Sequence, residues 1–310
     1  MVGPLESQEE LLPGFLVRDV RESDREAILA LTARTWDFGD YIKWVFDDWL
    51  NDTKGRFLAS EHIVTGKLAA IDKMTFLSLK EAWFEGLRVA PEFRGHGLAS
   101  RLQAYMIDQV RRAGGRTVRL LTSMANSAVH RMAYRDGFTL RAVFTFWKWT
   151  LPSEVPAVDD QPLRRATAGE ADILYHWWLC SSAYRSAGLC HRNWSFSETS
   201  LEEWAEATRE GRLFVHDSGI SNTPLPPPSV LLRSEARDDG STLWVIEALS
   251  AHDDDLPGLL AALVRTARTE GVAEINGLYV KDPSLEEGLR SSGFVPEDEG
   301  EPLCLFELHM

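Results

Sequence analysis

The 310-residue sequence has few cysteines, no long apolar run and no excess of basic residues. Its three cysteines, Cys180, Cys190 and Cys304, form no C-x-x-C pair and have no histidine at metal-ligand spacing. Neither a disulfide framework nor a metal site is therefore expected. No apolar stretch approaches the roughly 20 residues that span a bilayer, and the first residues lack the basic and apolar regions of a signal peptide. We expect a cytoplasmic protein with reduced thiols.

The charge balance also excludes partners. Lysine and arginine number 33 against 47 aspartate and glutamate residues, a net charge of −14. Nucleic acids and anionic membranes attract a basic field, so neither is an expected partner, whereas a cationic amine is compatible with this surface. With 44% hydrophobic and 26% charged residues, the composition is that of a globular protein, and the length suffices for two domains with separate cores.

One strand–turn–helix pattern dominates the sequence. Apolar and β-branched residues predict a strand over 83–89, which ends before Pro91. Gly95 and Gly97 then lead into a helix predicted over 98–113, where apolar residues recur at spacings of three and four. The unpaired amides and the dipole at the start of such a helix attract an anion, most simply a phosphate.

The glycine turn lacks the two commonest nucleotide-binding patterns. There is no G-x-G-x-x-G, because Ser100 stands three residues after Gly97, and no Gly-Lys-Ser/Thr. The string R-G-H-G-L-A instead resembles the acyl-coenzyme A pyrophosphate motif of the GNAT superfamily of N-acetyltransferases, written Q/R-x-x-G-x-G/A. Arg94, Gly97 and Ala99 occupy its three defining positions. The alternative is a plain surface turn.

The resemblance implies that acetyl-CoA is the acetyl donor and that this segment contacts it. In the family the strand before the loop is bulged, and its freed amides hold the acetyl carbonyl and the pantetheine arm. Gly86 is a residue that tolerates such a bulge. Asn126 stands where the family often has an asparagine that contacts the pantetheine arm. The other implied donor contacts are the backbone of Leu87, Arg88 and Val89 and the loop residues Arg94, Gly95, His96, Gly97, Leu98 and Ala99.

The candidate general base is Glu85. Many family members carry a glutamate four residues before the position of Val89, where it takes the amine proton directly or through water. Among apolar strand neighbours its pKa is expected to be raised toward neutrality. The alternative is a structural glutamate paired with Arg88 or Arg119.

The candidate general acid, Tyr134, is displaced from the family position. Family members often carry a tyrosine four residues before the G-F that ends the last helix, and Ala133 stands there in this sequence. Tyr134 follows one residue later, turned by about 100° around the helix. Ser127, His130 and water are the other proton sources, and because a coenzyme A thiolate is a tolerable leaving group, a missing acid would slow the reaction without preventing it.

Acceptor recognition is expected from the two helical segments before the hairpin. The string G-D-Y-I-K-W-V-F-D-D-W-L-N-D, together with W-F-E-G-L-R-V-A-P, resembles the histidine N-acetyltransferase type of this superfamily. The resemblance implies a small amine or free amino acid as the acceptor, with Asp40 and Tyr41 as contacts. A peptide N-terminus or lysine acceptor, and a non-catalytic acyl-coenzyme A sensor, are the alternatives. The acidic and aromatic set is Asp37, Asp40, Tyr41, Trp44, Asp47, Asp48 and Trp49.

The remaining elements of the first half follow from periodicity. Ser23 and Glu26 have the spacing of a capping box before a helix over 24–35. A strand over 15–20, a hairpin over 56–63 and 67–77, and a strand over 117–123 parallel to the 83–89 strand are also predicted. After a helix that opens near Asn126, a strand over 139–151 closes the sheet, which splays between the 83–89 and 117–123 strands and receives the coenzyme there.

The second half of the sequence weakly repeats the first. L-R-R-A-T-A-G-E-A-D-I-L (163–174) aligns with V-R-D-V-R-E-S-D-R-E-A-I (17–28), and Glu247-Ala-Leu echoes Glu85-Gly-Leu. The expected fold is a tandem α/β arrangement of two GNAT folds, each with a mixed sheet. The predicted organisation is a tail at 1–14, an acetyl-CoA-binding domain at 15–151, a linker at 152–162 and a degenerate copy at 163–310.

The second copy has an acidic stretch where the first has its glycine loop. The matching residues are S-A-H-D-D-D-L-P-G-L-L-A-A-L (250–263), and carboxylates at that place repel a pyrophosphate. We therefore predict that this copy does not bind coenzyme A and instead helps to shape the acceptor site. The chain is expected to act as a monomer or a homodimer.

Overall fold

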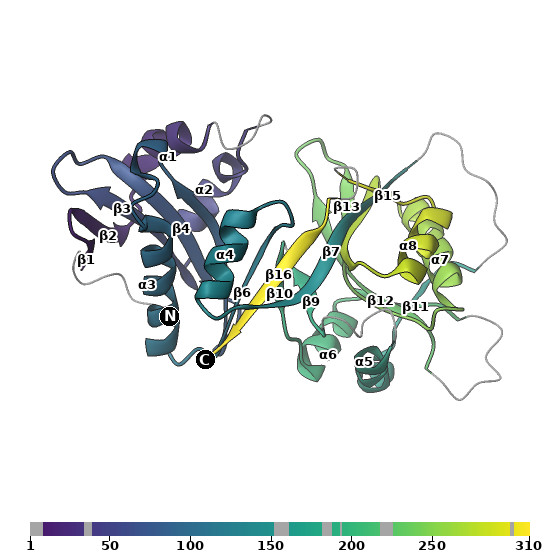
Figure 1. Ribbon diagram of the computed structural model, residues 1–310. Coiled ribbons are helices and arrows are strands. Elements are labelled where there is room, and N and C mark those ends of the chain that lie inside the picture. The colour runs from purple at the N-terminus through teal and green to yellow at the C-terminus, as the bar shows by residue number, and fades with distance from the viewer. Residues whose placement is uncertain are drawn as a thin grey trace. The chain divides into compact units, whose positions relative to one another are not determined.

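The computed structural model describes residues 9–33, 39–151, 161–181, 188–192, 194–217, 226–297 and 301–310. The chain divides into two compact units (Figure 1). The first unit comprises 1–121, 127–139 and 306–310, and the second unit comprises 122–126 and 140–305. Each unit therefore combines segments that are distant in the sequence.

The first unit is built on a mixed sheet with the strand order β1-β2-β3-β4-β5-β6-β16. Neighbours from β1 to β5 are antiparallel, whereas β5 and β6 run parallel as predicted. The strands are β1 (Glu9–Leu12), β2 (Phe15–Asp19), β3 (Gly55–His62), β4 (Leu68–Phe76), β5 (Glu81–Val89), β6 (Thr117–Ser123) and β16 (Leu303–His309).

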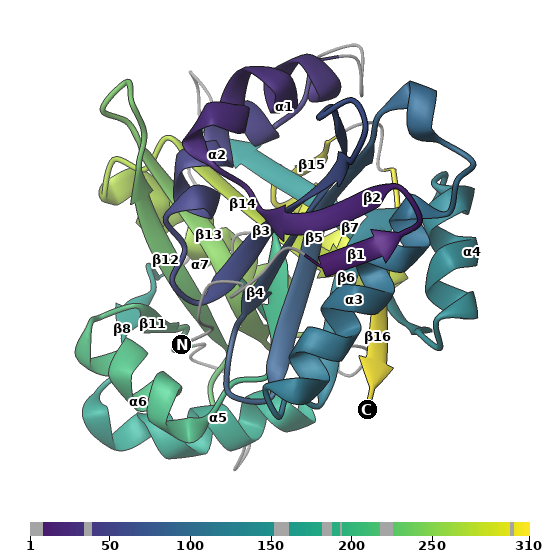
Figure 2. The same cartoon turned by 90° about the vertical axis from the view of Figure 1, so that its left-hand side faces the viewer.

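Helices cover both faces of this sheet. Figures 1 and 2 show α1 and α2 on one side and α3 on the other. Ile28 of α1 and Phe46 and Trp49 of α2 are buried against β3 and β4. The helices are α1 (Arg25–Thr32), α2 (Ile42–Leu50), α3 (Leu98–Arg112) and α4 (Ser127–Arg135), with the 3-10 turns η1 (Glu22–Asp24) and η2 (Pro91–Phe93).

The start of α1 differs from the prediction. The expected capping box of Ser23 and Glu26 is wrong, because η1 precedes the helix and α1 begins at Arg25 with no side-chain cap. The Asp24 carboxylate instead accepts a hydrogen bond from the backbone N–H of Arg21 at 2.7 Å. The predicted end of this helix at 35 lies outside the described residues.

The strand predicted over 139–151 forms as β7 (Thr139–Thr150), but its partners are unexpected. In the second unit β7 pairs antiparallel with β14, from Phe144↔Val280 to Thr150↔Glu274. The place beside β6 in the first unit is taken by the end of β16. The expectation that the 139–151 strand closes the first sheet is thus wrong, because a local pattern predicts a strand without specifying its neighbour. The predicted domain bounds stay a prediction.

The second unit has the sheet order β16-β7-β14-β13-β12-β11-β8, with β15 beside β7 and a separate hairpin of β9 and β10. Its strands are β8 (Arg164–Arg165), β9 (Cys190–Arg192), β10 (Ser195–Ser197), β11 (Leu213–Val215), β12 (Ser229–Ala236), β13 (Thr242–Ser250), β14 (Glu274–Val280) and β15 (Val295–Pro296). Its helices are η3 (Ala168–Glu170), α5 (Ala171–Cys180), α6 (Leu201–Arg209), α7 (Leu256–Thr269) and α8 (Pro283–Ser291).

The second unit repeats the element order of the first. β8, η3 and α5 follow the order of β2, η1 and α1, and β13, α7, β14 and α8 follow that of β5, α3, β6 and α4. β13 and β14 run parallel, like β5 and β6. The predicted mixed α/β fold in two copies is therefore confirmed. Within the described ranges, no helix has the length and apolar character required to cross a bilayer.

Candidate functional site

The strand β5 carries a bulge at the predicted place. Between the pairs Ile71↔Arg88 and Lys73↔Glu85, β4 has one residue and β5 has two. The first of these two, Gly86, has a φ of +78°, a conformation that side-chain-bearing residues rarely adopt. A bulge interrupts the ladder and redirects backbone N–H groups. The bulge predicted at Gly86 is confirmed.

Trp49 of α2 requires a glycine at this bulge. A Cβ added to Gly86 would lie 2.4 Å from Cη2 of the Trp49 ring. That ring is itself fixed, since it packs edge-on against Tyr41 and Phe57 with centroids 5.9 and 5.1 Å apart. Any side chain at position 86 must therefore displace either the bulge or a buried aromatic cluster.

The substitution Gly86→Ala is expected to destabilise the protein by about 2–5 kcal/mol, as judged by urea denaturation. Left-handed backbone costs an alanine roughly 1–2 kcal/mol, and forcing atoms into a packed core costs about 1–3 kcal/mol more. Gly66 in the β3–β4 turn is the matched control, because it has a φ of +63° and a Cβ there would meet no atom within 4 Å. Equal losses for Gly66→Ala and Gly86→Ala would show that the Trp49 contact is unimportant.

Glu85 lies immediately before the bulge and is half-buried. Burial raises its pKa to about 7, while the nearby Lys73 ammonium lowers the pKa and Asp52 raises it. Among the described residues none donates a hydrogen bond to the Glu85 carboxylate. A carboxylate with this pKa can accept a proton near neutral pH.

The two arginines predicted as structural partners of Glu85 pair with other carboxylates. Arg88 Nε lies 2.7 Å from Oδ2 of Asp40, and Arg119 pairs with Glu81 and Glu307. The alternative in which Glu85 is a structural residue paired with Arg88 or Arg119 is therefore not supported, because both arginines pair with other carboxylates.

Asp40 and Tyr41 lie at the start of α2, close to the bulged strand. Asp40 is 3% exposed, accepts hydrogen bonds from Arg88, and accepts one from the backbone N–H of Ile42 at 3.1 Å. Burial, followed by the charge of Glu85, raises the pKa of Tyr41 above its usual range. The Asp40 carboxylate is thus paired with Arg88 inside the protein. Tyr41, the second predicted acceptor contact, lies close enough to Glu85 for the charge of Glu85 to raise the Tyr41 pKa. Asp37 lies outside the described residues.

Asp72 is a second buried carboxyl group of β4, opposite the bulge. It is 2% exposed, and its Oδ1 accepts a hydrogen bond from the backbone N–H of Lys73 at 3.0 Å. Burial raises its pKa well above the usual range, and the Lys73 amide and the charge of Arg88 oppose this only in part. Burial therefore favours the neutral form of this carboxyl group in the folded protein.

The substitution Asp72→Asn is expected to stabilise the protein at pH 8 and to leave it little changed at pH 3.5. Because the pKa of Asp72 is higher in the folded than in the unfolded state, the folded state binds more protons between the two values, and stability falls as pH rises through that interval. Each unit of difference corresponds to about 1.4 kcal/mol. Urea denaturation at both pH values measures the effect. Asp238→Asn, at an exposed turn position, is the control, and a loss of stability at pH 8 would contradict the expectation.

The loop after β5 has open space around its two glycines. Gly95 and Gly97 both have a φ of +80°, and a Cβ at either would meet no atom within 4 Å. Gly97 is the N-cap of α3 and no side chain caps the helix. The first N–H groups of a helix have no acceptor within it, so this loop and helix start can receive an anion.

The other predicted loop residues surround this helix start. Arg94 is exposed, and its Nε donates a hydrogen bond to the carbonyl oxygen of Val89 at 3.3 Å. His96 Nδ1 lies 3.0 Å from the carbonyl oxygen of Arg94, so its ring contacts the loop backbone. Leu98 is buried under the loop and Ala99 is half-buried. The outer face of the loop thus consists of backbone groups and the exposed side chains of Arg94 and His96.

Beside the bulge, β5 and β6 separate as predicted. Their parallel pairing runs from Glu81↔Thr117 to Phe84↔Leu120, and both strands continue beyond it, β5 to Val89 and β6 to Ser123. The backbone of Leu87, Arg88 and Val89 lies in the part of β5 without a β6 partner. Backbone groups of β5 that have no β6 partner can form hydrogen bonds with a bound molecule.

Tyr134 and Asn126 lie in different parts of the fold. Tyr134 in α4 is 55% exposed, and its ring contacts Phe306 of β16 edge-on at 5.3 Å. Ala133, at the family position, is fully buried. Asn126 belongs to the segment grouped with the second unit, and its Nδ2 donates to Oγ1 of Thr122 at 3.1 Å. The contact with Phe306 was not foreseen from the sequence.

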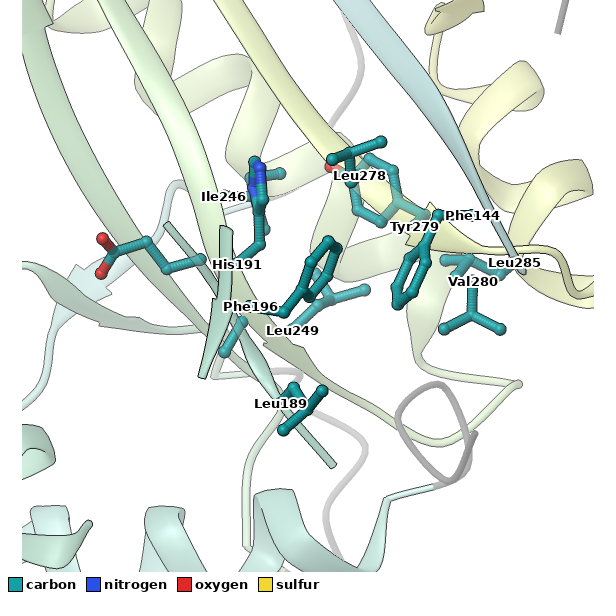
Figure 3. Close-up of a pocket in the computed structure, with 12 residues that line it drawn as sticks. Phe144, Leu189, His191, Phe196, Ile246, Leu249, Leu278, Tyr279, Val280 and Leu285 are labelled. Atoms are coloured by element: carbon teal, nitrogen blue, oxygen red, sulfur yellow. The ribbon is translucent and has the colours of Figure 1, made fainter. Parts of the chain in front are cut away.

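In the second unit, the place equivalent to the β5–β6 opening is filled. The β13–β14 pairing ends at Val245↔Asn276, and the following residues line a small cavity of about 40 Å³ (Figure 3). Phe144 of β7 and Phe196 of β10 meet there with ring centroids 4.3 Å apart. Aromatic side chains thus occupy the region that is open in the first unit.

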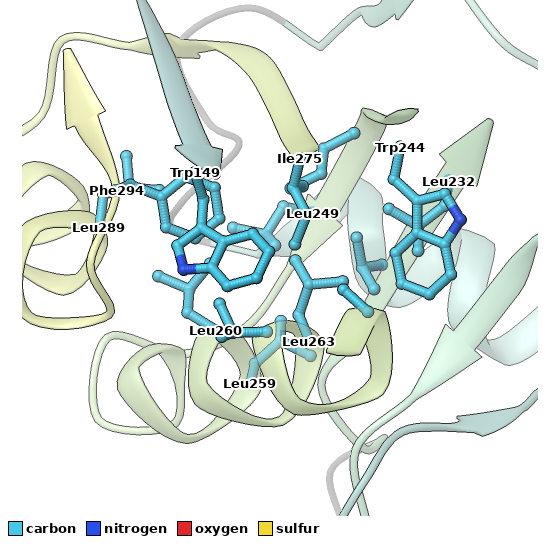
Figure 4. Close-up of a cluster of buried hydrophobic side chains, with 14 of the residues drawn as sticks. Trp149, Leu232, Trp244, Leu249, Leu259, Leu260, Leu263, Ile275, Leu289 and Phe294 are labelled. Atoms are coloured by element: carbon cyan, nitrogen blue, oxygen red, sulfur yellow. The ribbon is translucent and has the colours of Figure 1, made fainter. Parts of the chain in front are cut away.

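The acidic stretch of the second unit also differs from the glycine loop. Asp255 is the N-cap of α7, and Pro257 lies in the first helical turn, where it removes an N–H donor. The inner face of α7 packs Leu259, Leu260 and Leu263 into the core of the unit (Figure 4). The helix is therefore retained for packing, while its start has lost features that attract an anion.

Residues 23–138 match the model of the acetyltransferase (GNAT) family. Among curated proteins, no sequence matches the chain significantly.

Three solved structures have a similar fold. A GCN5-related N-acetyltransferase from Sphaerobacter thermophilus is 16% identical, with a TM-score of 0.65 over 97% of each chain. A tandem GNAT protein from the clavulanic acid biosynthesis pathway is 15% identical, with a TM-score of 0.54 over 95% of this chain and 98% of that one. A fungal glucosamine N-acetyltransferase region within a GH3 β-N-acetylglucosaminidase is 13% identical, with a TM-score of 0.60 over 95% of this chain and 38% of that one. The whole chain thus has a tandem GNAT fold, and its residues 23–138 are similar to the acetyltransferase (GNAT) family.

Proposed function

We propose that the protein transfers an acetyl group from acetyl-CoA to the amine of a small molecule or free amino acid. The observation that carries the proposal is the continuity of β5 with the glycine loop. One strand supplies Glu85 and the bulge, and the open loop follows its last residue within a few positions. A proton acceptor, backbone donors and an anion-binding helix start therefore belong to one continuous segment of the chain.

The residues present suit acetyl-CoA as the donor. Gly95 and Gly97 leave room for the pyrophosphate at the uncapped start of α3, with Arg94 and His96 beside it. The unpaired part of β5, Leu87 to Val89, offers backbone groups to the pantetheine arm and the acetyl carbonyl. In the second unit the filled opening and the start of α7 support the view that it does not bind coenzyme A.

The chemistry is a direct transfer in a ternary complex. Glu85 removes a proton from the acceptor ammonium, directly or through a water molecule, and the free amine attacks the thioester carbonyl carbon. A carbon–nitrogen bond forms, backbone N–H groups of the bulged strand stabilise the oxyanion, and the carbon–sulfur bond breaks. The departing thiolate takes a proton from Tyr134, or from Ser127, His130 or water, and the second proton lost by the attacking nitrogen restores that donor.

The acceptor site in this proposal involves Tyr41, with Asp40 acting by orienting Arg88. The chain acts as a monomer or homodimer without nucleic acid or membrane partners, and its cytoplasmic location stays a prediction. Histidine should be among the first acceptors tested, because the sequence resembles the histidine N-acetyltransferase type; that resemblance stays a prediction. Glucosamine is included on account of the fungal structure with a similar fold.

The test is release of coenzyme A thiol from acetyl-CoA with three acceptor classes: free amino acids, amino sugars and other small amines, and peptides. Turnover with a small amine supports the proposal. Turnover with peptides alone assigns a peptide N-acetyltransferase, and tight coenzyme A binding without turnover assigns a sensor. Arg94→Ala and Gly97→Glu should both weaken coenzyme A binding in calorimetry, and unchanged affinity in both variants would overturn the donor site.

A further inference from the structure

Lys73 is a buried cation directly across the sheet from Glu85. The two residues are Cα partners in the β4–β5 pair, so their side chains leave the sheet on the same face. The Lys73 side chain is 1% exposed. Lysine is almost never fully buried unless it is paired, and its presence beside the candidate base therefore requires an explanation.

Three hydrogen bonds fix the Lys73 ammonium. Its Nζ donates to Oδ2 of Asp52 and to Oγ1 of Thr75, both at 2.5 Å, and to the carbonyl oxygen of Met74 at 2.9 Å. Thr75 in turn donates to Asp52 at 3.0 Å. An ammonium has three protons, so these acceptors use all of them. Lys73 is thus a fixed charge that can act on Glu85 only through its electric field.

We propose that Lys73 is a positioning residue for the reaction: its fixed ammonium, opposite Glu85, favours the ionised carboxylate that removes the acceptor proton. The inference rests on the proposed function, in which Glu85 is the general base. The hydrogen bonds among Lys73, Asp52 and Thr75 already connect β4 to the loop after α2. The proposal adds an electrostatic role for the same three residues. The field is set by a network that does not itself contact the reacting atoms.

The other charged and titratable groups that act on Glu85 lie in β4 and at the two ends of α2. Asp52 follows α2 and opposes the effect of Lys73, raising the pKa of Glu85. Asp72 of β4 and Tyr41 before α2 also interact electrostatically with Glu85, and burial favours the neutral form of both. Lys73 is therefore the cation that balances burial at Glu85, and Asp52 is the carboxylate that limits its effect.

The experiment compares the pH dependence of kcat/KM in wild type, Lys73→Met and Asp52→Asn. Lys73→Met removes the charge at similar length, so the acidic limb, expected near pH 7 in wild type, should move up by about one pH unit or more. Asp52→Asn keeps an oxygen acceptor for Lys73 but removes the negative charge, so the limb should move down. Shifts of the acidic limb in opposite directions in the two variants support the proposal. If Lys73 and Asp52 had only a structural role, both substitutions would lower kcat/KM without moving the acidic limbs of the two pH profiles apart. An unmoved limb in folded Lys73→Met, or shifts in the same direction, overturns it.

Two further measurements keep the inference testable if a variant or an assay fails. If Lys73→Met does not fold, the double variant Lys73→Met/Asp52→Asn leaves no unpaired buried charge, and its limb should still lie above that of wild type. If no acceptor is turned over, the Glu85 carboxyl can be titrated by carbon-13 NMR, with Glu85→Gln to assign its signal. A midpoint raised by Lys73→Met supports the electrostatic role even when the proposed reaction is wrong. A midpoint equal to that of wild type rejects the role whether or not the enzyme is active.

Discussion

Replacing Glu85 by glutamine is expected to lower kcat/KM for acetyl transfer by about 10²–10⁴-fold at pH 7.5, which is the range for loss of a general base. The variant keeps the size and polarity of the side chain but cannot take a proton. Because the pKa of Glu85 is about 7, wild-type kcat/KM should rise about tenfold per pH unit below pH 7 and level off above it. In Glu85→Gln this rise should disappear. Coenzyme A release as a function of pH measures both effects.

Coenzyme A affinity should stay unchanged in Glu85→Gln, since the loop proposed to hold the pyrophosphate is untouched. Glu92→Gln is the matched control, because Glu92 is an exposed glutamate in η2 beside the same loop. Its kcat/KM should remain within about twofold of wild type, as expected of a surface substitution. If Glu85→Gln retained half of the wild-type rate, Glu85 would not be the base, and a water molecule or another group would have to accept the proton.

Arg119→Ala is expected to cost about 3–5 kcal/mol of stability, because it leaves two buried carboxylates without their cation. Arg119 on β6 is 1% exposed and pairs with Glu81 on β5 and, at 2.6 Å, with Glu307 on β16. These three strands are neighbours in the sheet of the first unit. Urea denaturation gives the size of the loss, and hydrogen exchange at the β6 and β16 amides should locate it there.

The control for Arg119→Ala is Arg112→Ala on the exposed face of α3. Arg112 Nε lies 2.7 Å from Asp108, but the pair is largely in water, so its loss should change stability little. Replacing all three buried charges by apolar residues of similar volume should recover much of the stability lost in Arg119→Ala. A small effect of Arg119→Ala would mean that water reaches Glu81 or Glu307.

The features that were predictable from the sequence are those encoded within one segment. The strand, the glycine turn and the helix from Glu81 to Arg112 lie close together in the chain, so the periodicity of apolar residues and the positions of glycine reveal them directly. The bulge at Gly86 belongs to the same class, since only a glycine suits its backbone and the Trp49 ring. The raised pKa of Glu85 likewise follows from its apolar strand neighbours.

The features that were missed depend on pairs far apart in the chain. Asp40 with Arg88, Asp52 with Lys73, and Arg119 with Glu307 join residues from different elements, and a single sequence does not reveal such pairings. As a result, Asp40 was predicted as a substrate contact rather than as a partner of Arg88. The burial of Lys73 is likewise not visible in the sequence, because a lysine inside a strand pattern usually points to solvent.

The position of β16 has a consequence for synthesis of the protein on the ribosome. β6 is complete at Ser123, but the strand that covers its edge begins at Leu303, about 180 residues later. At a translation rate of about 5–20 residues per second, this edge stays open for about 10–40 s. An unpaired edge with apolar neighbours is a site of aggregation. The nascent first unit is therefore expected to need protection by chaperones until residues 306–309 emerge, even though the sequence of its site is already complete.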